Sequence, residues 1–208
     1  MEAEKYRLQV FVNTPFDRAY RRLFYAIVFA VKDCGYTARS ALEISDASEL
    51  RLAKIFRIIS ECGLGIHDIS RTELNRVSRL PRFNMPLELG MFLGAKEFGD
   101  SAQRAKKCLV LDRSPHRYEK FCSDIKGCDM SSHRRNPEAA IRAVRDFLRD
   151  AQPTVSIPGG QMIQRRYVRF LKTLPLVCKE LGLRANDLIF NDYTTLVGRW
   201  LKQEADPR

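Results

Sequence analysis

Short apolar runs recur along the first 150 residues of this chain, and each is followed by a segment with helical spacing. The clearest runs are LQVFVN at residues 8–13, LGIHDI at residues 64–69 and KCLVLD at residues 107–112. Continuous apolar runs of this length are typical of parallel strands, because helices cover both faces of their sheet. We also predict weaker strands at residues 36–43 and 127–131.

The segments between these runs carry the boundary signals of helices. Asp17 is in the N-cap position of a helix that starts at Arg18, and Gly35 is in the position that ends it. Asp46 and Glu49 have the spacing of a capping box at the start of the next helix. The expected helices span residues 18–34, 46–62, 86–98 and 137–151, with a short helical piece at 118–123.

Regular alternation of strands and helices predicts a parallel sheet with helices on both faces. Connections between parallel strands are right-handed, which restricts the topologies that such a chain can adopt. We therefore expect an α/β fold of the flavodoxin-like (Rossmann-like) type. Its five strands, numbered along the chain, would lie in the order 2-1-3-4-5.

The pattern changes at residues 152–160, QPTVSIPGG, where two prolines and a glycine pair interrupt it. We take residues 1–151 as the α/β domain, residues 152–160 as a linker and residues 161–208 as a helical appendage. Helices are expected at residues 161–181 and 191–202, and Pro175 should kink or split the first of them. The appendage would pack on the core domain, form an oligomer contact or dock a partner.

Composition narrows the classes of protein to which this chain can belong. With 208 residues, of which 45% are hydrophobic, the chain can build a full core. It has no apolar window of the roughly 18 residues that a membrane span needs, and its N-terminus lacks a signal-peptide pattern, so we expect a cytoplasmic protein without membrane contact. The six cysteines form no CxxC pair, and neither a disulfide nor a metal site is expected. The net charge of +11 permits anionic partners such as nucleotides or nucleic acid, although a solvated basic surface explains it equally well.

Two acidic residues are the candidate catalytic groups. In an open parallel sheet, ligands bind beyond the carboxyl ends of the strands where the strand order reverses, here between the first and third strands. Asp68 stands at the end of the third strand, and Glu88 follows Pro86 in what we expect to be the first turn of a helix. The positive end of the helix dipole would keep Glu88 ionised, as a nucleophile or a stabiliser of an oxocarbenium ion must be. Acidic residues are also common in first turns for purely structural reasons, and Asp68 could simply cap the turn.

The loop at residues 70–85 is much longer than the about 2–6 residues usual between a strand and a helix, so we expect it to line the ligand crevice. Its arginines at positions 71, 76, 79 and 82 could bind phosphates or be solvated. His67 should point away from Asp68 and lie in the core, because side chains alternate along a strand. Phe16 and Tyr20 could stack on a base or pack in the core. The candidate substrate-binding residues are Asn13, Thr14, Pro15, Phe16, Tyr20, Ile69, Ser70, Arg71, Asn84 and Met85.

Three motifs, FVNTPFD, GIHDIS and FNMPLELGMFLGAK, together resemble the nucleoside 2-deoxyribosyltransferase superfamily, which is similar in fold to TIR domains. The resemblance covers roughly residues 8–150. It implies that Glu88 is the catalytic residue, with Gly90 in the glycine position of the motif, and that Asp68 contacts the nucleoside. It also implies a homo-oligomer in which two subunits can share each active site.

The chain departs from the transferase pattern just before Glu88. A run similar to D-x-G-T usually precedes the glutamate in the transferases, whereas this chain has Arg82-Phe83-Asn84-Met85-Pro86. The departure favours hydrolysis of an N-glycosidic bond over base exchange. Proteins resembling this one also occur as toxic effectors in bacterial antiphage systems, including retrons, beside nucleoprotein complexes.

We therefore expect an N-glycosidase that uses no cofactor and acts on NAD or another nucleotide as substrate. The alternatives are a deoxyribosyltransferase and a non-catalytic module that senses nucleotides or serves as a scaffold. A receiver-like signalling domain also fits the fold class, but it needs acidic residues beside the first strand, where this chain has Asn13 and Thr14.

Overall fold

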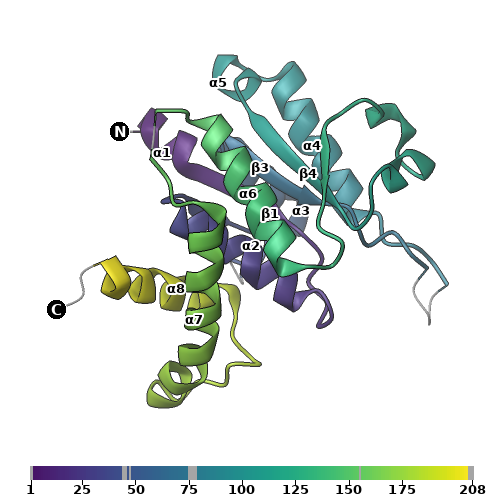
Figure 1. The fold of residues 1–208 in the computed structure, drawn as a ribbon. Coiled ribbons are helices and arrows are strands. Elements are labelled where there is room, and N and C mark those ends of the chain that lie inside the picture. Colours follow the sequence, from purple (N-terminus) through teal and green to yellow (C-terminus); the bar gives the residue numbers. More distant parts are fainter. Residues whose placement is uncertain (1, 44–45, 47, 75–78, 155, 206–208) are drawn as a thin grey trace.

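The protein is built on a central five-stranded sheet in which every strand pairing is parallel (Figure 1). The computed structural model describes residues 2–43, 46, 48–74, 79–154 and 156–205. The strand order is β2-β1-β3-β4-β5, which confirms the predicted flavodoxin-like arrangement. The strands are β1 (Gln9–Asn13), β2 (Thr37–Arg39), β3 (Leu64–Asp68), β4 (Lys107–Asp112) and β5 (Met130–Ser132).

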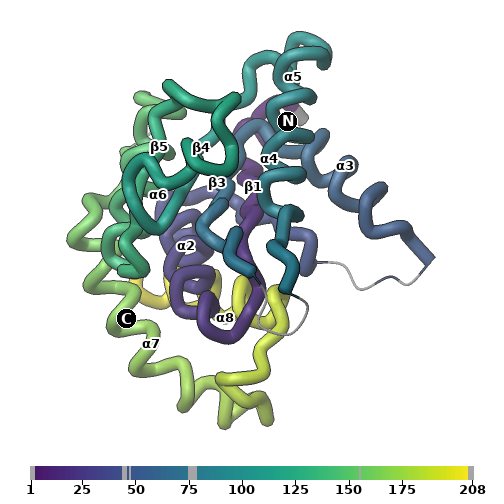
Figure 2. The backbone as a smooth tube through the Cα atoms, turned by 90° about the vertical axis from the view of Figure 1, so that its right-hand side faces the viewer, coloured from purple at the N-terminus to yellow at the C-terminus, as the bar shows by residue number. Residues whose placement is uncertain are grey.

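Helices cover both faces of the sheet and make three layers, which Figure 2 shows edge on. Side chains alternate along each strand, so each strand contributes to two separate cores. In β1, Val10 and Val12 pack with α2 and α6, whereas Phe11 packs with α3 and α4. The covering helices are α2 (Arg21–Asp33) and α6 (Pro137–Ala151) on one face, and α3 (Arg51–Glu61) and α4 (Asn84–Phe98) on the other.

Short elements at the edges complete the α/β unit. The N-terminal helix α1 was not predicted from the sequence, and the Tyr6 hydroxyl ties it to the carbonyl of Ala102 in α5 at 3.0 Å. The helical piece expected at residues 118–123 forms two 3-10 turns instead of one segment. These elements are α1 (Glu2–Leu8), α5 (Ser101–Arg104), η1 (Arg117–Lys120) and η2 (Ser123–Ile125).

Two helices begin later than their capping signals predict. Asp17 accepts hydrogen bonds from the backbone N–H groups of Ala19 and Tyr20, both at 3.1 Å, and so closes a turn ahead of α2 instead of capping it. The predicted capping box of Asp46 and Glu49 is also not the start of a helix, because α3 begins at Arg51. Residue 47, within that box, lies outside the described residues, as do residues 44 and 45 just before it.

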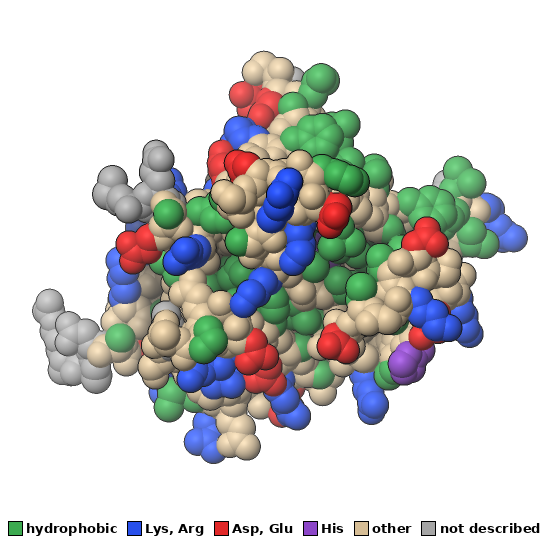
Figure 3. All heavy atoms as spheres, turned by 90° about the horizontal axis from the view of Figure 1, so that it is seen from above, with side chains coloured by type: hydrophobic (Ala, Val, Ile, Leu, Met, Phe, Trp, Pro, Cys, Tyr) green, Lys and Arg blue, Asp and Glu red, His purple; other side chains and the backbone are tan. Residues whose placement is uncertain are grey.

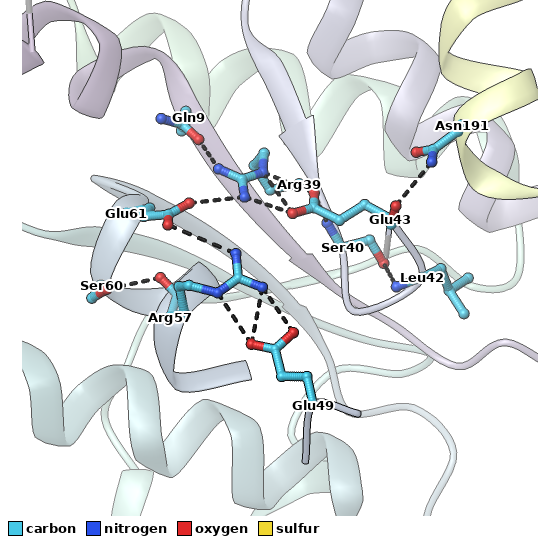
Figure 4. A network of polar contacts seen from close by, with 10 residues as sticks. All are labelled: Gln9, Arg39, Ser40, Leu42, Glu43, Glu49, Arg57, Ser60, Glu61 and Asn191. Carbon is cyan, nitrogen blue, oxygen red and sulfur yellow. Dashed lines mark hydrogen bonds and ion pairs between the residues drawn. The ribbon is translucent and has the colours of Figure 1, made fainter. Parts of the chain in front are cut away.

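Strand β2 is shorter than the predicted run at residues 36–43, because the residues after Arg39 form a polar network instead of pairing with β1 (Figure 4). Arg39 forms ion pairs with Glu43 at 2.5 Å and with Glu61 of α3 at 2.9 Å. The chain turns at Ser40, whose carbonyl accepts a hydrogen bond from the Glu43 N–H at 3.0 Å. Asn191 then donates to the Glu43 carbonyl at 2.8 Å and ties the C-terminal region to this edge.

The C-terminal helices α7 (Gly160–Glu180) and α8 (Phe190–Ala205) pack on the outer side of α2. All nine residues from Leu23 to Val31 in α2 are consequently buried. Tyr193 of α8 stacks on Tyr25, with ring centroids 3.9 Å apart, and donates a hydrogen bond to the Tyr25 carbonyl at 2.9 Å. Helix α7 continues through Pro175 and is not split there. Within the described part of the chain, no helix has the length and apolar character needed to cross a membrane.

Candidate functional site

Asp68 lies at the carboxyl end of β3, fully buried on the face of the sheet covered by α2 and α6. Its carboxylate accepts hydrogen bonds from the Tyr20 hydroxyl and, at 2.8 Å, from the backbone N–H of Ser70. His133 Nε2 lies 3.0 Å from Asp68 Oδ2, although the geometry is not that of a hydrogen bond. Asp68 is therefore the centre of a buried polar cluster that includes two candidate residues, Tyr20 and Ser70.

His133 is the member of this cluster that the sequence analysis missed. It follows β5 directly, and its N–H donates to the carbonyl of Asp112 at the end of β4. The Arg135 N–H donates to His133 Nδ1 at 2.9 Å, so a neutral His133 carries its proton on the nitrogen that faces Asp68. Its place after a predicted strand was the available signal, since the carboxyl ends of parallel strands meet at one edge of the sheet.

Glu88 lies on α4, and both its position in the helix and its environment differ from what we predicted. The helix begins at Asn84, so Glu88 is its fifth residue and lies beyond the first turn, where the helix dipole acts most strongly. The side chain is 3% exposed, and its Oε2 atom has no hydrogen-bond partner among the described residues. Burial raises the pKa of Glu88 to about 7, against the opposing influence of Arg51. Burial therefore opposes the ionised form that the helix dipole was expected to favour.

The two acids lie on opposite faces of the sheet. His67 contacts Phe92 of α4, with ring centroids 4.9 Å apart, so the next residue, Asp68, points toward the other face. This arrangement follows from the alternation of side chains along β3 and agrees with the expected orientation of His67. Asp68 and Glu88 therefore approach the same end of the sheet from different sides, and no described contact joins them.

Asn13 and His67 fix the start of α4 against the sheet. Asn13 Nδ2 contacts His67 Nδ1 at 3.1 Å and donates to the carbonyl of Met85 at 3.0 Å. Burial lowers the pKa of His67 to about 3, which keeps the ring neutral. Three buried oxygens at this end lack a hydrogen-bond partner within the described ranges, namely Asn13 Oδ1, Thr14 Oγ1 and Glu88 Oε2. Buried oxygens without a hydrogen-bond partner are rare in proteins, and a catalytic role is one of the reasons for which they occur.

A cavity of about 380 Å³, here called the α4 cavity, opens beside the start of α4. It contains five of the candidate binding residues, whereas Ile69 is 1% exposed and packs in a hydrophobic cluster with Met85 and Leu89. Of the loop arginines, Arg76 lies outside the described residues and Arg79 is not in the lining. The lining comprises Pro15, Phe16, Asp17, Arg51, Arg71, Glu73, Leu74, Arg82, Asn84 and Met85.

A second cavity of about 490 Å³, here called the α2–α6 cavity, lies on the other face of the sheet beside the Asp68 cluster. Arg71 lines both cavities and forms an ion pair with Asp17 at 2.7 Å. The candidate site is thus one edge of the sheet with two basic cavities that share an arginine. The lining comprises Ala19, Tyr20, Arg22, Leu23, Ser70, Arg71, Arg113, His133, Arg135, Asn136 and Pro137.

We also compared the chain with models of protein families, with curated proteins and with solved structures. None of the three comparisons found a match.

Proposed function

We propose that this protein hydrolyses the N-glycosidic bond of a nucleotide such as NAD, held in the α4 cavity, with Glu88 as the catalytic residue. The observation that carries the proposal is the buried Glu88 carboxyl group, whose Oε2 has no hydrogen-bond partner within the described ranges. Glu88 lies just behind the cavity lining: Asn84, one helical turn before it, lines the cavity, as does Arg51, which acts electrostatically on Glu88. The sequence resemblance independently implies the same glutamate.

The lining of the α4 cavity suits the parts of a nucleotide. Phe16 supplies an aromatic surface for a base, and arginine guanidinium groups pair with phosphate oxygens in bidentate geometry. The arginines Arg51, Arg71 and Arg82 all line this cavity, with Asp17 and Glu73 as the acidic residues. The balance of charge in the lining therefore favours an anionic ligand.

In the proposed reaction the bond between C1′ and the base nitrogen breaks, and its electron pair leaves with the base. Ionised Glu88 stabilises the resulting oxocarbenium ion, and the oxygen of a water molecule then bonds to C1′ and releases a proton. A low dielectric strengthens this charge interaction, which is what a buried carboxylate provides. Asp68, which is held by Tyr20 and Ser70, would position the loops around the ligand without touching it.

The test is product analysis with purified protein, incubated with NAD and with nucleosides and nucleotides of both sugars, followed by chromatography of the released base. We expect Glu88→Gln to lower kcat by about 100-fold or more, as the loss of a charge that acts in the transition state does. Glu97→Gln, an exposed residue of the same helix, is the matched control and should keep full activity. Full activity in Glu88→Gln would refute the assignment.

Activity should also depend on pH in a defined direction. The reaction needs ionised Glu88, and burial raises the pKa of this residue to about 7. The value of kcat/KM should therefore fall tenfold per pH unit well below pH 7 and level off above it. If kcat/KM does not change between pH 5 and 8, the ionisation of Glu88 does not take part in the rate-limiting step.

Two alternatives give different outcomes in the same assay. A deoxyribosyltransferase would form a new nucleoside when an acceptor base is added, whereas a hydrolase would release only free sugar and base. A nucleotide-sensing or scaffolding module would bind a nucleotide saturably without turnover, and Glu88→Gln would bind it equally well. Three further proposals rest on the sequence resemblance alone: a toxic role in antiphage defence, a homo-oligomer and a nucleoprotein partner. Co-purification of the protein with nucleic acid would test the nucleoprotein partner.

A further inference from the structure

The α2–α6 cavity holds an excess of positive charge that the proposed reaction does not use. Four arginines line it, and they come from four separate segments of the chain: Arg22 from α2, Arg71 from the loop after β3, Arg113 from the loop after β4, and Arg135 from the loop before α6. Such convergence is unlike a uniformly basic surface. On the face seen in Figure 3, Lys and Arg side chains are interspersed with Asp and Glu.

Among the residues that the structure describes, only two carboxylates pair with these four guanidinium groups. Asp17 pairs with Arg71 at 2.7 Å. Glu73 is shared, because it pairs with Arg113 and lies 3.9 Å from Arg135. Arg22 has no ion pair with any residue that the structure describes. Burial, together with the positive charge of neighbouring arginines, lowers the pKa of Arg113, as expected where like charges are crowded.

Two further features of the cavity favour an anion. The 15-residue helix α6 begins at its edge, where Asn136 caps the helix by accepting from the Glu138 N–H at 2.9 Å and Pro137 is the first helical residue. The positive end of a helix dipole attracts anions. His133, which is 1% exposed, also lines the cavity. Its Nε2 lies 3.0 Å from Asp68 Oδ2 but makes no hydrogen bond among the described residues, so its N–H can still be donated to an anion.

We propose that the α2–α6 cavity binds the phosphate or pyrophosphate group of a phosphorylated small molecule. Two guanidinium groups without a carboxylate of their own match an anion that carries about two negative charges, and phosphate accepts the bidentate hydrogen bonds that arginine donates. A volume of about 490 Å³ is within the range of small-molecule sites. The site lies across the sheet from Glu88, and the inference does not depend on the reaction proposed above.

The experiment is a calorimetric titration of the full chain with inorganic pyrophosphate at fixed ionic strength. We expect saturable binding to the wild type, weakened about tenfold or more in Arg22→Gln/Arg135→Gln. Both replaced side chains are exposed, so the double variant should fold, and its circular dichroism spectrum is the check. Arg165→Gln/Lys172→Gln, which removes two exposed positive charges of α7, is the control matched for net charge and should bind as the wild type does.

Three results would overturn the proposal: no saturable binding, unchanged affinity in Arg22→Gln/Arg135→Gln, or an equal loss in Arg165→Gln/Lys172→Gln. The phosphate could belong to the nucleotide in the neighbouring α4 cavity or to a separate effector. Displacement of pyrophosphate by a nucleotide, lost in Phe16→Ala, identifies the first source, and simultaneous binding of both identifies the second. Glu88→Gln should bind pyrophosphate normally, so a failure of the proposed reaction would not be confused with a failure of this site.

Discussion

Glu88 shows two opposing influences on one carboxyl group. A helix start favours the ionised form, but the side chain lies in the second turn of α4 and is buried, and burial raises its pKa to about 7. Desolvation wins because no described group donates a hydrogen bond to Oε2. The buried Glu88 carboxylate therefore lowers the stability of the folded protein, and a purely structural role would not require an ionisable group at this position.

Replacing Glu88 should stabilise the protein at alkaline pH. The folded-state pKa of about 7 exceeds the ordinary value of 4.5, so the folded protein binds this proton more tightly than the unfolded chain does. Stability is consequently lost as the pH rises from 4.5 to about 7, by up to about 3 kcal/mol. Glu88→Gln should recover part of this free energy at pH 8 and have little effect at pH 4.

Urea unfolding at the two pH values measures the effect, with Glu97→Gln as the control. A variant that is more stable at pH 8 yet inactive would show that the loss of activity is not a loss of folding. Equal stability of wild type and Glu88→Gln at both pH values would contradict the raised pKa.

At the scale of elements, the contact between β3 and α4 depends on a glycine. A Cβ atom at Gly65 would lie 2.6 Å from His67 Nε2 and 2.9 Å from the ring of Phe92. Real Cβ atoms do not approach other atoms so closely, so a larger residue would push α4 away from the sheet. This contact positions both Glu88 and the α4 cavity.

We therefore expect Gly65→Ala to lower the free energy of unfolding by about 1–3 kcal/mol, which is the usual cost of overpacking a core. The matched control is Gly94→Ala in α4, where an added Cβ meets nothing within 4 Å. That change should stabilise the protein by about 0.5–1 kcal/mol, because alanine is the better helix former. Thermal unfolding of both variants tests the pair, and a neutral Gly65→Ala would show that α4 can move.

At the scale of the whole molecule, α2 lies in the middle of a single hydrophobic core. The sheet and α6 cover one side of it, and α7 and α8 cover the other. A helix that is apolar all round needs such cover. The chain beyond residue 160 thus belongs to the same packed body as the sheet.

Substitutions at Tyr193 test how much the packing of α8 on this core contributes to the free energy of unfolding. Tyr193→Ala should cost about 3–5 kcal/mol, because it removes a fully buried ring stacked on Tyr25. Tyr193→Phe keeps the ring and removes only the hydrogen bond to the Tyr25 carbonyl, so it should cost about 1 kcal/mol. Denaturant unfolding followed by two probes, one in α8 and one in the sheet, gives both values. Two separate transitions in the wild type would mean that the C-terminal helices unfold on their own.

The sequence by itself determined the order of the five strands and of the main helices that cover them, because apolar periodicity is a local property that each segment carries. It also located the carboxyl ends of β1 and β3 as the candidate site, since topology follows from strand order. Helix starts were less accurate. Asp17 closes a turn ahead of α2 because a capping side chain can satisfy a turn as well as a helix, and α4 begins at Asn84, two residues before the predicted start at Pro86.

Only the tertiary structure decided what each acidic residue contacts. Asp68 and Glu88 are separated by the sheet, and Asp68 lies beside His133, which is distant in sequence. The raised pKa of Glu88 and the convergence of four arginines likewise depend on burial and on contacts between distant segments. Such contacts arise when the chain folds and are not encoded in the local spacing of residues.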